Sequence, residues 1–130
     1  MMSSRSKLLF VAISGFLLVA FGAFGAHVLT KILGTQEMAW IHTGLEYQAW
    51  HTLAILGLSC LRPASRWFDR SAGLLAVGVL LFSGSLYALA LTHLKFLVFI
   101  TPLGGLCFLA GWLLMLIGAL RLKQRADCHE

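Results

Sequence analysis

Charged residues are scarce in this chain of 130 residues. Asp, Glu, Lys and Arg make up 12% of the sequence and hydrophobic residues 59%, whereas a soluble domain carries about 25% charged residues. The first apolar run, residues 8–26, contains no charge at all. Three further apolar stretches follow, and a helix of roughly 20 such residues crosses the hydrocarbon core of a bilayer. The sequence therefore predicts an all-α integral membrane protein, a four-helix bundle in which residues 1–130 form a single membrane domain.

The sequence also lacks the patterns that hold metals or perform covalent catalysis. Its three cysteines, Cys60, Cys107 and Cys128, have no CxxC spacing and offer no disulfide framework. There is no HExxH motif, and the serines within the apolar stretches lack the context of a nucleophile elbow. Asp69 is expected to be a solvated charge at the cytoplasmic side. We therefore expect no catalytic residue, no metal, no cofactor and no enzymatic activity.

The apolar stretches define four expected membrane spans, at about residues 8–33, 36–61, 71–92 and 96–120. Gly34 is expected to end the first helix and Thr35 to cap the second. The pair Arg62-Pro63 is expected to end the second helix. Pro102 either starts the fourth helix or kinks a longer one, and the sequence leaves both alternatives open.

Basic residues gather at one end of the expected spans. Eight lie at that end, namely Arg5, Lys7, Arg62, Arg66, Arg70, Arg121, Lys123 and Arg125, whereas the other end has only Lys31 and Lys95. Because cytoplasmic loops carry the excess of Lys and Arg, both termini are expected in the cytoplasm. The net charge of +5 does not predict nucleic-acid binding, because the basic residues follow the span ends. The expected partner is the lipid bilayer.

Small residues recur at helical spacing in three of the spans. Such residues let helix backbones approach closely in lipid, where dispersion and weak hydrogen bonds hold helices together. The residues expected to pack helices are Gly15, Gly22 and Ala26 in the first span, Gly84 in the third, and Gly104 and Gly111 in the fourth. The Gly22/Ala26 pair would also serve a homodimer.

Polar side chains gather in the second span. At 100° per residue, one half of this helix carries His42, Glu46, Tyr47, Trp50, His51, Ala54 and Gly57. We expect this half to face the bundle, and the half with Leu45, Ala49, Thr52, Leu53 and Leu56 to face lipid. Because an ionised carboxylate is costly in the membrane, we expect Glu46 to be paired, hydrated or protonated, and His27 is a candidate partner. The candidate polar site of the outer half is therefore His27, Glu46, Tyr47, Gln48, His51 and Tyr87.

Three interpretations of this polar site compete. In the first, its residues form a hydrogen-bonded network that fixes helix packing in a structural or partner-binding protein, because buried polar groups need partners whatever the function. In the second, the site belongs to a small oligomeric transporter or proton-coupled channel that uses His27, Glu46 and His51. In the third, it binds haem, a metal, a lipid or a quinone, with His27 and His51 as ligand candidates. We favour the first, which allows a homo-oligomer or another membrane protein as partner.

Five sequence segments resemble those of one family. They are residues 22–27 (GAFGAH), 43–51 (TGLEYQAWH), 83–87 (SGSLY), 101–105 (TPLGG) and 111–112 (GW). With them the chain resembles the YgdD-type small inner-membrane proteins, whose eukaryotic relatives are called transmembrane protein 256. The resemblance implies a multi-pass protein with four spans in a bacterial inner (plasma) membrane, and it implies no activity. The motif residues coincide with His27, Tyr47, Gln48, His51 and Tyr87, whereas His42 lies outside them.

Overall fold

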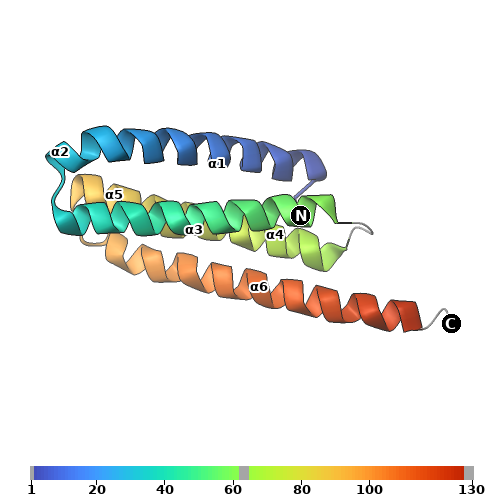
Figure 1. Cartoon of the computed structure of the whole chain (residues 1–130). Coiled ribbons are helices and arrows are strands. Elements are labelled where there is room, and N and C mark those ends of the chain that lie inside the picture. The colour runs from blue at the N-terminus through green and yellow to red at the C-terminus, as the bar shows by residue number, and fades with distance from the viewer. Residues whose placement is uncertain (1, 62–64, 128–130) are drawn as a thin grey trace.

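The computed structural model describes residues 2–61 and 65–127, and all regular structure in this part is helical (Figure 1). The first long helix consists of α1 (Ser4–Phe24), the π-helical turn η1 (Gly25–Leu29) and α2 (Thr30–Ile32). The second is α3 (Thr35–Cys60). The third combines α4 (Arg66–Gly78), the π-helical turn η2 (Val79–Ser83) and α5 (Gly84–Thr92), and the fourth is α6 (Leu97–Asp127). The predicted all-α class is confirmed.

Local chemistry explains where the helices begin and end. The Ser3 and Ser65 hydroxyls accept hydrogen bonds from the first turns of α1 and α4, as N-cap side chains do. The first helix ends where Leu33 becomes extended, and Gly34 rather than Thr35 precedes α3. At the end of α5, His93 has the left-handed conformation (φ 57°). The expected stop at Arg62-Pro63 lies outside the described residues.

Of the two alternatives for Pro102, the structure shows a longer helix that contains the proline and does not start at it. α6 begins at Leu97, so Pro102 falls in its second turn. Its missing N–H removes one backbone hydrogen bond there. The neighbouring Thr101 hydroxyl lies 2.6 Å from the Ser85 hydroxyl, and this contact links α6 to α5.

The long helices pack in the order of the chain. α1 packs on α3, α3 packs on α4 and α5, and these pack on α6. Figure 1 shows α3 in front of α4 and α5, with α1 above it and α6 below. Both termini lie at the same end of the molecule (Figure 1). The bundle is therefore open in the sense that α1 and α6, the first and last long helices, do not close it by packing on each other. α1 has α3 as its main helical neighbour.

Three segments of the described chain are long and apolar enough to cross a membrane: Ser4–Ile32, Arg66–Thr92 and Leu97–Leu122. α3 matches them in length but carries more polar side chains, Glu46 among them. The described part of the chain thus has four long helices, of which three have the composition of a membrane span.

Gly104, Gly111 and Gly118 of α6 lie in close helix contacts. An added Cβ would meet Leu75 of α4 at 2.6 Å from Gly111 and Phe68 at 2.8 Å from Gly118, and from Gly104 it would meet the Phe82 backbone. The Ser71 hydroxyl donates a 2.7 Å hydrogen bond to the Gly111 carbonyl, which the close approach permits.

The structure does not place the other predicted packing residues in helix contacts. A Cβ added to Gly15, Gly22 or Gly84 would meet nothing within 4 Å, and Ala26 is exposed. In α1 it is Ser14 that faces α3, so Gly15, Gly22 and Ala26 lie outside this contact, and Gly84 is exposed on α5.

An ion pair joins α1 to α4 near the chain termini. The Lys7 ammonium donates to Asp69 Oδ1, and the two side chains are 6% and 20% exposed. Asp69 is therefore not the solvated charge that the sequence predicts. Its position in the first turn of α4 directs it toward Lys7, and this pair holds the start of α1.

Candidate functional site

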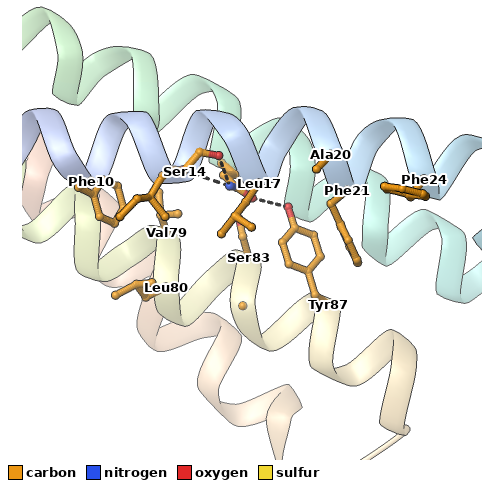
Figure 2. Close-up of a pocket in the computed structure, with 13 residues that line it drawn as sticks. Phe10, Ser14, Leu17, Ala20, Phe21, Phe24, Val79, Leu80, Ser83 and Tyr87 are labelled. Carbon is orange, nitrogen blue, oxygen red and sulfur yellow. Dashed lines mark hydrogen bonds between the residues drawn. The ribbon is translucent and has the colours of Figure 1, made fainter.

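A groove separates α1 from η2 and α5. It has a volume of about 480 Å³, and its lining is apolar apart from Ser14, Gln48, Ser83 and Tyr87 (Figure 2). Leu17 of α1 and Leu80 of η2 lie on its two sides and are 53% and 65% exposed. The groove therefore opens sideways, toward the surroundings of the helices. η2 forms part of one wall, and such π-turns often occur at functional sites.

Gln48 of α3 organises the polar side of this groove. Its Nε2 donates to the Ser14 carbonyl at 2.9 Å and to the Ser14 hydroxyl at 3.1 Å, and its Oε1 accepts a 2.7 Å hydrogen bond from the Tyr87 hydroxyl (Figure 2). The Ser14 hydroxyl also contacts the Thr52 hydroxyl at 2.7 Å. These groups satisfy one another across α1, α3 and α5. They fix the relative position of three helices and leave the groove with an apolar character.

Replacing Gln48 by leucine is expected to loosen α1. The substitution removes three hydrogen bonds and leaves the Tyr87 hydroxyl without its acceptor, and a buried polar group left unpaired costs about 1–3 kcal/mol. We expect a loss of about 2 kcal/mol in the free energy of unfolding, measured by denaturation in mild detergent. Gln36→Leu, on the exposed first turn of α3, serves as control, since Gln36 has no such bonds among the described residues. An unchanged stability of Gln48→Leu would show that the network does not hold α1.

His51 belongs to a second cluster, between α3 and α6. Its ring stacks on Phe108 with centroids 3.6 Å apart. Its Nδ1 lies 2.6 Å from the Tyr47 carbonyl, and Trp112 Nε1 donates to its Nε2 over 3.2 Å. Because a carbonyl only accepts and an indole N–H only donates, both bonds form together only in the neutral ring with its proton on Nδ1. His51 is thus a packed, hydrogen-bonded residue in this arrangement.

The predicted site residues do not form one site. Gln48 and Tyr87 meet at the groove, while Tyr47 and His51 belong to the aromatic cluster with Phe82 and Phe108. His27 in η1 and Glu46 in α3 are both exposed, and no bond joins them in the described part of the chain.

The predicted orientation of the second span is wrong for most of its residues. The face toward the bundle carries Ile41, Gly44, Gln48, His51, Thr52 and Ile55, which are buried. His42, Glu46, Trp50 and Gly57 instead lie on the exposed side, and Trp50 is 66% exposed. The physical reason is that Ile41, Gln48 and Ile55, at seven-residue spacing, lie on one face of α3. Ile41 packs in a core cluster with residues of η1 and α5, Gln48 bonds α1 and α5, and Ile55 packs in the core with α4 and η2.

Sequence reasoning missed several residues of these clusters. Ser14 and Thr52 join the Gln48 network, Ser83 donates to the Gly44 carbonyl at 2.7 Å, and Trp112 bonds His51. One signal was available for Ser14, because it is the single polar side chain in the apolar run 8–26 and needs a partner in lipid.

The described residues contain no group of three or more His, Cys, Asp or Glu side chains that could hold a metal ion. Of the two histidines considered as ligands, His27 is exposed on η1, whereas both ring nitrogens of His51 make hydrogen bonds.

Comparisons with known proteins identify relatives along the whole chain. Residues 21–105 match the family model described as "Protein of unknown function (DUF423)". The chain is 62% identical to the UPF0382 inner membrane protein YgdD of Escherichia coli K12, over 99% of this chain and all of that protein. A UPF0382 membrane protein of Haemophilus influenzae is 48% identical, over 88% and 93% of the two chains, and one of Staphylococcus haemolyticus is 41% identical, over 79% and 85%. No solved structure matches. The resemblance predicted from the sequence is confirmed.

Proposed function

The chain belongs to the DUF423 family, and we propose that it is a non-enzymatic protein of the bacterial inner membrane that binds one acyl chain of a phospholipid in the groove beside α1. The observation that carries this proposal is the groove itself, with its apolar lining and its sideways opening. Its volume of about 480 Å³ lies in the range of ligand sites, roughly 300–1,000 Å³.

The chemistry of the groove favours a hydrocarbon chain over a polar ligand. Ser14, Gln48 and Tyr87 already bond one another, so they offer no free partner to a charged substrate. Along α1 the lining extends from Phe10 to Phe24, a rise of about 21 Å at 1.5 Å per residue. This exceeds half of a hydrocarbon core of about 30 Å, which suits a long chain lying along the helix.

For the membrane placement we propose four spans with both termini in the cytoplasm. In this placement α3 also crosses the membrane, in addition to the three helices that have the composition of spans. It has to do so because it connects two of them. The common end of the termini supports this placement (Figure 1). So do Arg5 at the start of α1, Arg66 and Arg70 at the start of α4, and Arg121 toward the end of α6. A transporter or proton-coupled channel receives less support, because Glu46 and His27 do not face the groove.

Filling the groove is expected to displace the lipid. Ala20 lines the groove and its neighbour Val19 does not, being 71% exposed on the outer surface of α1. We expect Ala20→Trp to lose most of the phospholipid that the wild type retains through purification in mild detergent, whereas Val19→Trp retains it. Mass spectrometry of the purified protein measures the bound lipid per chain. Equal retention by both variants would refute the groove as the site, and an isoprenoid quinone in place of phospholipid would refute the choice of ligand.

A further inference from the structure

The exposed side of α3 carries ionisable residues at the depth of the membrane centre. We call this surface the outer face of α3 and define it by Ala39, His42, Glu46, Trp50, Leu53 and Gly57, all of which are exposed. Glu46 lies within two residues of the middle of α3 (Thr35–Cys60), and His42 precedes it by one helical turn. Among the described residues, neither side chain has a hydrogen bond or ion pair.

Such a face is unsuited to contact with lipid. Charged side chains at the bilayer centre are costly, and in known proteins they face a bundle interior or a water-filled cavity, or pair with one another. The described helices do not cover this face, since α4 and α5 lie behind α3 and α1 and α6 lie on either side of it (Figure 1). If α3 crosses the membrane, a second protein surface over this face would shield Glu46 from lipid and offer it a partner.

The spacing of the face fits a parallel helix partner. Ala39, Glu46 and Leu53 of this face recur every seven residues, and Cys60, at the end of α3, continues the repeat and is also exposed. A seven-residue repeat keeps one seam of a helix against a partner that crosses at about 20°, as in most membrane bundles. Ala39 and Gly57 add small side chains, and nothing lies within 4 Å of a Cβ at Gly57, so a neighbouring backbone has room to approach.

We propose that a second copy of this chain covers the outer face of α3, forming a two-fold dimer through parallel α3 helices. Two copies inserted in the same orientation place their α3 helices at equal depth. In parallel helix packing, each seam side chain inserts into a pocket formed by four residues of the facing helix. One of these four residues lies one turn before the equivalent seam residue of that helix. His42 of each copy then meets Glu46 of the other, giving two identical pairs. Such self-complementarity is what a two-fold interface requires.

This inference rests on the proposed spanning of the membrane by α3, but it is independent of lipid binding. The groove contains no residue of the outer face. A negative result in the lipid experiment would therefore not contradict the dimer, and a monomeric protein would not contradict lipid binding in the groove.

Exchanging the two residues tests the reciprocal pairing. Glu46→His alone places two imidazoles on the face, His42→Glu alone places two carboxylates, and the double variant restores complementarity with the positions reversed. We expect dimerisation in mild detergent, measured by multi-angle light scattering across a dilution series, to weaken about tenfold or more in each single variant and to recover in the double variant. A wild type that remains monomeric, or a double variant no better than the singles, would overturn the proposal.

Cys60 provides a second measurement that leaves His42 and Glu46 unchanged. In membranes containing a variant whose Cys107 and Cys128 are replaced by serine, mild oxidation is expected to link Cys60 to its counterpart. The matched control moves the single cysteine to Val19, which is 71% exposed on α1. Cross-linking of Cys60 but not of the cysteine at position 19 supports the dimer. Cross-linking at neither site, or at both equally, contradicts it.

Discussion

A Gly104→Ala variant is expected to lose about 3 kcal/mol of the free energy of unfolding, because overpacking a tight contact costs typically 1–3 kcal/mol. The added Cβ would overlap the backbone nitrogen and Cα of Phe82 in η2. Unlike the end of a side chain, this backbone cannot rotate away, so α6 and η2 have to separate. Denaturation by SDS in mild detergent measures the loss, and reduced expression in membranes would accompany it.

The adjacent Gly105 supplies the control. A Cβ added there meets nothing within 4 Å, and alanine is favoured over glycine in a helix by about 1 kcal/mol. Gly105→Ala is therefore expected to leave the free energy of unfolding unchanged or to raise it. Similar losses in the two variants would mean that the contact of Gly104 with Phe82 does not determine the approach of the helices.

Asp69→Asn is expected to destabilise the protein by about 3 kcal/mol, the lower end of the range for breaking a buried ion pair. The substitution leaves the Lys7 ammonium, only 6% exposed, without its carboxylate. The lower end applies because Asp69 itself is 20% exposed and water partly screens the pair. Unfolding in mild detergent again gives the measurement, and release of the start of α1 should appear as faster proteolysis near the N-terminus.

A double replacement distinguishes the stability contributed by the ion pair from the penalty of leaving the Lys7 ammonium buried without a partner. In Lys7→Met/Asp69→Leu no charge remains buried, so most of the stability lost by Asp69→Asn is expected to return. Arg70→Gln, at the exposed neighbour of Asp69, should change stability by less than about 0.5 kcal/mol. A double variant as unstable as the single one would show that Lys7 and Asp69 contribute through something other than their mutual attraction.

Helices and their connections were predictable because lipid imposes strong constraints on a chain. Runs such as residues 8–26 have to be helical in a membrane, since no other backbone arrangement of a single segment satisfies its own hydrogen bonds. Gly34 predicted the position of the first connection to within one residue. The resemblance carried by five segments, residues 43–51 among them, indicated the family. The lengths of α1 and α6 beyond the apolar runs depend on capping by Ser3 and on the polar continuation after Arg121.

The orientation of the helices was the weaker part of the prediction. In water a polar stripe marks the outside of a helix, but in lipid both faces are apolar, and polar residues mark either the interior or an interface. Gln48 and Glu46 are two residues apart in the same helix and have opposite surroundings. The π-turns η1 and η2 also shift the facing of residues that follow, which a constant 100° per residue does not capture.

The packing of helices in chain order has a consequence for how the protein forms. α1 can pack on α3 as soon as the first two long helices have been synthesised. α4 and α5 can then pack on α3, which is already in place. Contacts between neighbours in the sequence form quickly because they close short loops. The hydrogen bond from Trp112 to His51 is different, since it links α3 to the last helix. Assembly on the ribosome can therefore proceed helix by helix, and the aromatic contact between α3 and α6 completes it.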